Sequence, residues 1–136
     1  IHNRGFCDGL VPSLGGISID ATTAAAGEYK NLEHFGGNLD IASVEELLKE
    51  KGQDGIAYIH LETCPAGWNG QPVSMENFRQ TKQLASSHGV ALVIDISHVQ
   101  ENAYWIKQVE QKDSDVMDIV REIVSLADVV LMDAQI

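Results

Sequence analysis

The chain has 136 residues, of which 44% are hydrophobic, and this is enough apolar material for the core of one domain. Its formal net charge of −11, with no cluster of lysine or arginine, excludes a protein that binds the phosphate backbone of nucleic acid. No apolar run approaches the roughly 18 residues of a membrane span, and the first ten residues lack the order of a signal peptide, so we expect a cytoplasmic protein that does not cross a membrane.

Two cysteines are present, Cys7 and Cys64. They lie far apart without a C-x-x-C spacing, which matches neither a set of zinc ligands nor a disulfide framework. We therefore expect reduced thiols and no metal site.

Strand and helix patterns alternate along the chain. Residues 3–15 are rich in glycine and proline and predict a loop. Short runs of apolar and β-branched residues then predict four strands, at 16–20, 55–61, 90–95 and 127–132.

Helical periodicity fills the intervals between these runs. Ser43 and Glu46 form a capping box at the start of the first predicted helix, and Gly52 ends it. Ser74 is the predicted cap of the next helix, which stops at residues 88–89. Two further helices are predicted over 99–111 and from about residue 114. The residues expected to face inward are Ile41, Val44, Leu47, Leu48, Met75, Phe78, Ala85, Val116, Ile119, Val120 and Ile123.

This alternation predicts the α/β class. A strand that is followed by a helix and then by another strand favours a mostly parallel sheet with helices on its faces and right-handed crossovers. No repeat or low-complexity linker interrupts the pattern, so we expect residues 1–136 to form a single α/β domain or part of one.

Asp95 is the first candidate site residue, because it ends the apolar run that starts at Val90. In open parallel sheets, ligands bind outside the carboxyl ends of the strands. A carboxylate at that place can hold a cationic ring nitrogen, orient a ribose, bind a metal, or only cap the next turn. From the residues around Asp95 alone, all four roles stay open.

Three segments together resemble one enzyme family. They are GQPVSM at 70–75, the run 88–95 that ends in Val-Ile-Asp, and ENAY at 101–104. Their order and spacing are similar to those of the β-eliminating lyases that depend on pyridoxal phosphate (PLP), the family of tyrosine phenol-lyase and tryptophanase. The resemblance is good over most of the chain after residue 40 and weak before it.

The resemblance implies a fold, a cofactor and a reaction. The fold is part of the large domain of the fold-type-I PLP-transferases, which are aspartate aminotransferase-like. Asp95 would lie beside the pyridine nitrogen and keep it protonated, so that the ring accepts the electrons released at the substrate Cα. The amino-acid substrate, aromatic or related, would lose its β-substituent and give pyruvate and ammonia.

Two positions near the expected cofactor depart from the family pattern. His98 stands where the family has an arginine close to the phenolic oxygen of PLP; a histidine can donate to this oxygen, or it is a turn residue satisfied by backbone. Ala66 stands where the family has an asparagine, and Asn69 compensates only in a rebuilt loop. Trp68, in the same loop, contacts a ligand or anchors the loop.

The last residues depart further. Where the family has Ser-Gly-Lys-Lys, this chain has Asp133, Ala134, Gln135 and Ile136. Asp133 and Gln135 would stand near the cofactor phosphate, where one brings negative charge and the other a neutral donor, and Ile136 replaces the lysine that forms the Schiff base. The lysines that do not match this place are Lys49, Lys51, Lys82, Lys107 and Lys112.

Two hypotheses follow. In the first, the chain is a fragment of a lyase whose catalytic lysine lies on another piece, and it associates with the missing remainder or with further copies, since the family builds its sites at dimer interfaces. In the second, it is a non-catalytic α/β module that binds a small anion or a partner subunit, and Asp95 caps a turn. Nicotinamide-binding and Ser-His-Asp hydrolase alternatives lack their G-x-G-x-x-G and G-x-S-x-G motifs.

Overall fold

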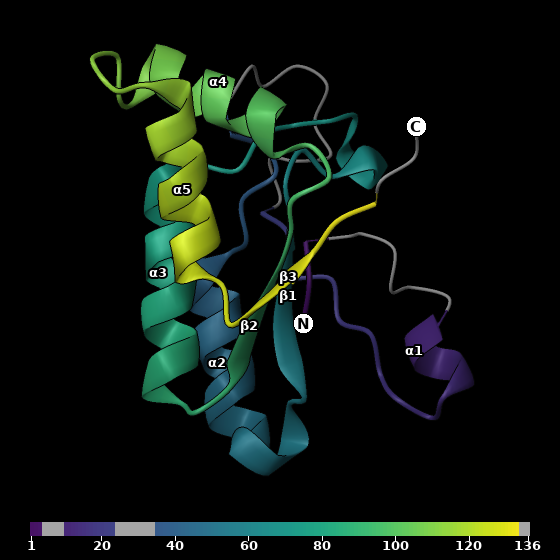
Figure 1. Ribbon diagram of the computed structural model, residues 1–136. Helices are drawn as coiled ribbons and strands as arrows, with labels where there is room; N and C mark the ends of the chain where they lie inside the picture. Colours follow the sequence, from purple (N-terminus) through teal and green to yellow (C-terminus); the bar gives the residue numbers. More distant parts are fainter. Residues whose placement is uncertain (4–9, 24–34, 134–136) are drawn as a thin grey trace.

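The computed structural model describes residues 1–3, 10–23 and 35–133 (Figure 1). Three parallel strands form a sheet in the order β1-β2-β3, and they are β1 (Tyr58–Glu62), β2 (Ala91–Asp95) and β3 (Val129–Leu131). The α-helices are α1 (Leu10–Ser13), α2 (Ile41–Lys51), α3 (Met75–Ser87), α4 (Val99–Val109) and α5 (Val116–Leu126). Two short 3-10 helices, η3 (Gln53–Gly55) and η4 (Ala66–Trp68), complete the described elements.

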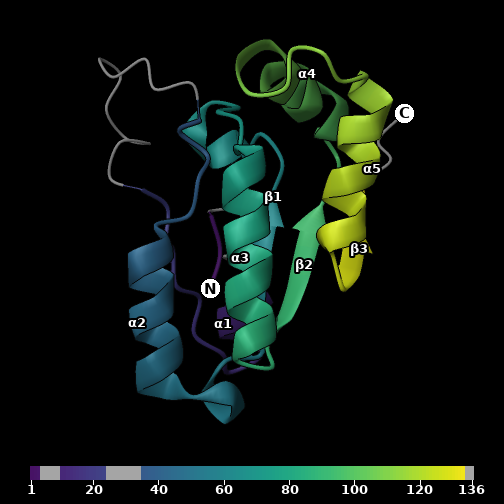
Figure 2. The same cartoon turned by 90° about the vertical axis from the view of Figure 1, so that its left-hand side faces the viewer.

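The predicted α/β class is confirmed. Helix α3 connects β1 to β2, and helices α4 and α5 connect β2 to β3. Helices α2, α3 and α5 lie on the same face of the sheet, while α1 lies on the opposite side (Figures 1 and 2). Within the described residues, no helix has the length and apolar character needed to cross a membrane.

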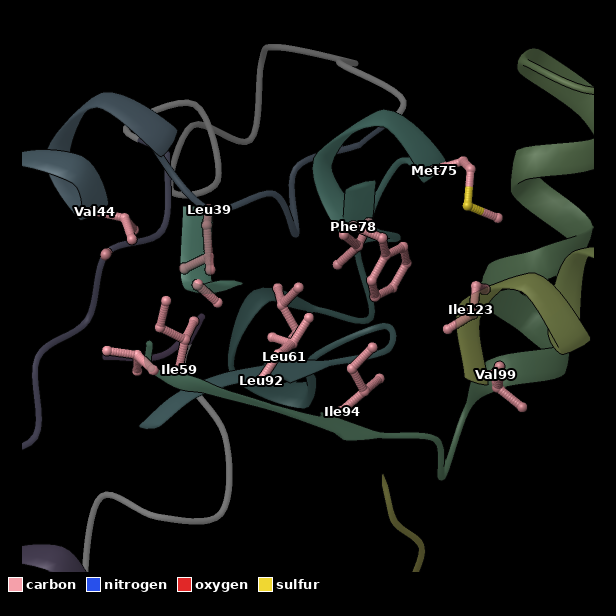
Figure 3. Close-up of a cluster of buried hydrophobic side chains, with 14 of the residues drawn as sticks. Leu39, Val44, Ile59, Leu61, Met75, Phe78, Leu92, Ile94, Val99 and Ile123 are labelled. Carbon is pink, nitrogen blue, oxygen red and sulfur yellow. The ribbon is translucent and has the colours of Figure 1, made fainter. Parts of the chain in front are cut away.

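The hydrophobic core lies between the sheet and these helices. Successive strand residues point to opposite faces, so Ile59 and Leu61 of β1 and Leu92 and Ile94 of β2 all face the helices and are fully buried (Figure 3). Phe78 of α3 packs among them. Burial of each such side chain contributes roughly 1.5–3 kcal/mol to folding.

The predicted strand at 16–20 is wrong in extent. Only Asp20 forms an isolated parallel bridge, with His2, and His2 forms a second bridge with His60 of β1. The His2 amide donates to the Ile19 carbonyl at 2.9 Å, and the Ala21 amide donates to the His2 carbonyl at 2.9 Å. The segment therefore approaches the sheet at one point, where residues 1–3 separate it from β1. The last predicted strand is also shorter, at Val129–Leu131.

The capping box predicted at Ser43 is wrong as well. Helix α2 begins at Ile41, and its N-cap is Asp40, whose Oδ1 accepts from the amides of Ala42 at 3.1 Å and Ser43 at 3.3 Å. The Ser43 hydroxyl donates to Asp40 Oδ2 at 2.8 Å. A carboxylate three residues earlier thus starts the helix and satisfies its first free amides.

The other helix ends agree with the sequence. Gly52 ends α2 with a positive φ of 68°, a conformation that glycine adopts at low cost. Ser74 caps α3, because its side chain accepts from the Asn77 amide at 3.1 Å. Helix α5 begins at Val116 after an Asp115 cap, close to the predicted start.

Candidate functional site

The carboxyl ends of β1 and β2 bring two acidic side chains to the same edge of the sheet. Glu62 is the register partner of Asp95, and each is the last residue of its strand. Because Leu61 and Ile94 face the helices, Glu62 and Asp95 point to the opposite face of the sheet. The local sequence pattern singles out Asp95 but not Glu62, since register across strands is not visible in such a pattern.

Asp95 holds a tight turn. Its Oδ1 accepts from the Ser97 amide at 2.9 Å and from the Ser97 hydroxyl at 2.5 Å. This is the local capping role that the sequence left open. The described residues give Oδ2 no hydrogen bond, so one oxygen fixes the carboxyl group and the other is available to a ligand.

Thr63 ties the turn to β1. Its amide and its hydroxyl both donate to the Asp95 carbonyl, at 3.0 Å and 2.8 Å, and the side chain is fully buried. The Thr63 hydroxyl oxygen also accepts from the His98 amide at 3.2 Å. The backbone of the candidate site is therefore held by a residue that no local pattern in the sequence singles out.

His98 is exposed and occupies the N-cap position of α4. Its side chain makes no capping hydrogen bond. Its backbone amide donates to the Thr63 hydroxyl oxygen at 3.2 Å, and its carbonyl accepts from the Asn102 amide at 3.1 Å. The predicted role of His98 toward a cofactor oxygen stays a prediction. Exposure leaves its imidazole accessible from the carboxyl edge of the sheet.

Glu62 is an incompletely satisfied carboxyl group. Its Oε1 accepts from the Ala66 amide at 3.3 Å, whereas Oε2 is buried and has no hydrogen-bond partner. Burial raises the pKa of Glu62, and the negative charge of Asp95 raises it further, against the lowering effect of the Ala66 amide and the His98 charge. The protonated form of Glu62 would relieve repulsion beside Asp95.

Asp133 lies beside the same turn, because its amide donates to the Ser97 hydroxyl oxygen at 2.8 Å. Its side chain is exposed. Ser97 therefore links Asp95 to Asp133, and no pattern in the sequence had singled it out. Gln135 lies outside the described residues.

The loop after β1 places its residues differently. Trp68 is half-buried, and its indole N–H donates to the Thr22 hydroxyl at 3.0 Å, which agrees with a loop anchor. Asn69 is exposed and has a left-handed conformation with φ 55°. Within the described segments, no hydrogen bond joins Asn69 to Asp95.

The two motifs GQPVSM and ENAY are joined by one buried side chain. The Asn102 Oδ1 accepts from the Val73 amide at 2.8 Å and the Cys64 amide at 3.3 Å, and its Nδ2 donates to the Val73 carbonyl at 2.8 Å. Asn102 is fully buried. The motifs thus hold together the loop between β1 and α3 and the start of α4, the segments that border the candidate site.

The other titratable groups described here are either buried in the core or paired with an opposite charge. Burial raises the pKa of the Cys64 thiol to about 12, so this thiol is protonated and poorly nucleophilic. Lys49, Lys51 and Lys82 pair with Glu45, Glu50 and Asp128 at 2.6, 2.7 and 2.6 Å. Across residues 1–3, 10–23 and 35–133, no group of three or more histidine, cysteine, aspartate or glutamate side chains is placed to hold a metal. Cys7 lies outside the described residues.

Comparison with known proteins matches this chain to one family. A family model described as beta-eliminating lyase matches residues 9–135. A tyrosine phenol-lyase of Pasteurella multocida is 43% identical over 96 residues, which cover 69% of this chain and 21% of that protein. For a tyrosine phenol-lyase of Clostridium tetani, the identity is 39% over 84% of this chain and 25% of the relative. A tryptophanase of Hyphomonas neptunium is 41% identical over 93% of this chain and 28% of its own length. The chain therefore spans less than a third of each relative.

Proposed function

Because this chain belongs to the β-eliminating lyase family, we propose that it forms part of a PLP-dependent enzyme that cleaves an amino acid by β-elimination. The proposal rests on the position and the hydrogen bonds of the Asp95 carboxyl group. It ends β2 at the carboxyl edge of a parallel sheet, Ser97 fixes one oxygen, and the described residues leave the other oxygen without a partner. Such a fixed carboxylate suits a protonated ring nitrogen.

When bound, PLP supplies an electron sink for the charge that develops at the substrate Cα. Asp95 would hold the proton on the ring nitrogen, and the donors of Ser97 would keep its carboxyl group oriented. His98, exposed at the start of α4, would donate to the ring oxygen. Asn69, Asp133 and Gln135 are proposed to border the cofactor on the basis of their positions in the family pattern.

The proposed substrate is an aromatic or related amino acid, because two of the relatives are named tyrosine phenol-lyase and one tryptophanase. Its products would be pyruvate and ammonia. The lysine that the reaction needs is proposed to come from another part of the same enzyme or from a second copy, since Ile136 occupies the matching position. We place this assembly in the cytoplasm.

One observation favours a second candidate function. Asp95 already caps a turn through Ser97, and this role needs no cofactor. In that case the chain would be a non-catalytic α/β module that keeps the scaffold of the family and binds a partner subunit or a small anion. The two candidates differ in whether the charge of Asp95 matters beyond the turn.

Two substitutions of Asp95 separate these candidates. Asp95→Asn retains an oxygen for the Ser97 donors but removes the charge, whereas Asp95→Ala removes both. PLP binding would be measured by equilibrium dialysis and by the visible spectrum of the protein freed of unbound cofactor, with Asp54→Asn at the other edge of the sheet as control. We expect Asp95→Asn to weaken binding at least about tenfold, by loss of a charge-assisted contact, with little change in unfolding free energy.

If Asp95 only caps the turn, Asp95→Asn will match the wild type in both measurements, and Asp95→Ala will lower stability alone. Borohydride reduction followed by mass spectrometry gives a further readout. Covalent attachment of the cofactor would identify a lysine of this chain within reach of the site. Its absence would direct the search for this lysine to a partner chain, without altering the role of Asp95.

A further inference from the structure

Glu62 and Asp95 are two carboxyl groups that leave the sheet side by side. They are register partners at the ends of β1 and β2, and both side chains point to the same face. Neighbouring strands lie about 4.8 Å apart, so the two groups are close enough to interact electrostatically. Asp95 is the residue on which the proposed cofactor site depends, and the contacts of Glu62 indicate what its neighbour adds to that site.

Glu62 lacks the hydrogen bonds that would stabilise a carboxylate. Its Oε1 accepts only from the Ala66 amide, at 3.3 Å, and its Oε2 is buried without a partner among the described residues. The carboxyl group of Asp95, by contrast, is held at Oδ1 by the amide and the hydroxyl group of Ser97. A charged oxygen that is buried without a donor is costly, and a proton removes this charge. Glu62 is therefore placed to carry a proton beside Asp95.

The charges around Glu62 act on this proton in opposite directions. Burial raises the pKa of Glu62, the negative charge of Asp95 raises it further, and the charge of His98, at the N-cap of α4, lowers it. A positive charge at this edge of the sheet thus favours the ionised form of Glu62, and a negative charge favours the protonated form. The other titratable side chains near this edge, within the described residues, are His60 on β1, Cys64 after it, Glu101 on α4 and Asp133 after β3.

We propose that Glu62 and Asp95 work as a coupled carboxyl pair. Glu62 keeps a proton while Asp95 has no cationic partner, and it releases this proton to the solvent when the protonated ring nitrogen of the cofactor binds Asp95. The proposal rests on the proposed function, because it takes the ring nitrogen as the partner of Asp95. The bound cation offsets the negative charge that keeps Glu62 protonated, and it acts in the same direction as the charge of His98.

The coupling gives Glu62 a role in binding. The ring nitrogen keeps its own proton throughout, and after the release the carboxyl pair presents two negative charges to the cation instead of one. Because linkage is reciprocal, a cofactor that expels the proton of Glu62 also binds more tightly when this proton is already absent. Glu62 is thus a positioning residue that acts through Asp95.

The first test needs no cofactor. The side-chain carboxyl carbon of Glu62 would be followed by NMR across about pH 4 to 8, in the wild-type 136-residue protein and in Asp95→Asn, which keeps an oxygen for the Ser97 donors. In this variant we expect the midpoint of the Glu62 titration to move toward the ordinary value of 4.5, since the neighbouring charge is gone. A midpoint that Asp95→Asn leaves unchanged would overturn the carboxyl pair.

The second test adds PLP. Bound PLP should move the midpoint of the Glu62 titration in the same direction in the wild-type protein. Affinities from equilibrium dialysis give an independent readout, because Glu62→Gln resembles the protonated acid but has no proton to release. The ratio of the wild-type association constant to that of Glu62→Gln should rise with pH through the titration of Glu62, by at most about tenfold per pH unit, the limit for one proton.

Glu46→Gln, on the exposed surface of α2, is the control, and its ratio to the wild type should not change with pH. A constant ratio for Glu62→Gln, or bound PLP that leaves the Glu62 midpoint in place, would overturn the coupling. Absence of PLP binding would overturn the proposed function and the coupling to the cofactor, whereas the titration in Asp95→Asn would still decide whether the two carboxyl groups interact. If thermal melts show that Asp95→Asn does not fold, the measurements with PLP decide.

Discussion

Thr63 and Asp95 are joined by two hydrogen bonds between neighbouring strands. The amide and the hydroxyl of Thr63 both donate to the Asp95 carbonyl, at 3.0 Å and 2.8 Å, and the same hydroxyl oxygen accepts from the His98 amide at 3.2 Å. A single buried side chain that directly follows β1 thus fixes the backbone on both sides of the turn. The geometry of the candidate site therefore depends on a residue that is itself fully buried.

Replacement of Thr63 by valine should therefore destabilise the protein. Valine keeps the shape but removes the hydroxyl group, which leaves the partly buried His98 amide without its acceptor and the Asp95 carbonyl without one of its two donors. We expect a loss of about 1–3 kcal/mol in the free energy of unfolding. Urea titration followed by circular dichroism measures it. Thr63→Ser keeps the hydroxyl group and should lose less; an equal or larger loss in Thr63→Ser would assign the effect to packing.

Asn102 should be among the most sensitive polar positions. Asn102→Ala leaves the Val73 amide and carbonyl and the Cys64 amide without their partner, in a fully buried place. We expect a loss of about 2–4 kcal/mol from these unpaired groups. Asn102→Asp keeps an acceptor for the two amides and should give a different loss at pH 5 and pH 8, since a buried carboxylate is costly. Chemical denaturation measures the free energy of unfolding. A value for Asn102→Ala within about 0.5 kcal/mol of the wild type, as for an ordinary surface substitution, would contradict this role.

The start of α2 offers a comparison between two capping residues. Asp40→Ala removes the acceptor of the Ala42 and Ser43 amides, and we expect a cost of about 1 kcal/mol. Asp40→Asn should cost much less, because asparagine is an equally good cap. Ser43→Ala removes only a donor to the Asp40 side chain. The melting temperatures of the three variants test this order. If Ser43→Ala has the lowest melting temperature, the result would favour the capping box that the sequence predicted.

Glu62 should make stability depend on pH in a defined direction. The pKa of Glu62 in the folded protein is raised from an ordinary value of 4.5. Between 4.5 and the higher folded pKa, Glu62 is therefore protonated in the folded state and ionised in the unfolded state. Stability then falls as the pH rises through this interval, and the penalty is fully present above the folded pKa. Glu62→Gln should be more stable than the wild type at pH 7, with the difference shrinking toward pH 4.

Melting temperatures across pH 4 to 7 measure the effect, with the exposed residue Glu46 replaced by glutamine as a matched control. His60 acts with the opposite sign over a neighbouring interval: burial lowers its pKa, so stability from His60 is lost as the pH falls below the ordinary value of 6.5. The comparison is therefore made between variants at each pH. A Glu62→Gln protein that is less stable than the wild type at pH 7 would show that the charge of Glu62 is satisfied.

The sequence could predict those elements that local patterns determine. The run Val90 to Ile94 is apolar without interruption, as expected for a strand with both faces covered, and Gly52 and Ser74 mark helix ends with residues that favour these backbone conformations. The pattern favoured Ser43 as the cap of α2, through its capping box with Glu46, whereas the structure has Asp40; both residue types cap helices well. Residues 16–20 have the composition of a strand but make only one bridge, at Asp20.

The candidate site was predicted less completely, for a physical reason. Asp95 could be found because it ends an apolar run, but Glu62, Thr63 and Ser97 act through strand register and a turn. Register joins residues that are far apart in the chain, and it is set by the packing of both strands on the helices. Asp95 and Asp133 both bond to Ser97, and the His98 amide bonds to Thr63, but the predicted roles of these three residues toward a cofactor stay predictions.

Strand β2 lies between β1 and β3 along the sheet. Its backbone groups are therefore engaged on both sides, and opening any one of them requires separation of two strand pairs at once. Amide hydrogen exchange should be slowest there, approaching the rate set by global unfolding. Asp95 is thus attached to the part of the molecule that opens least often, so a ligand at this carboxyl group would meet a site that is already ordered and would lose little free energy in arranging it.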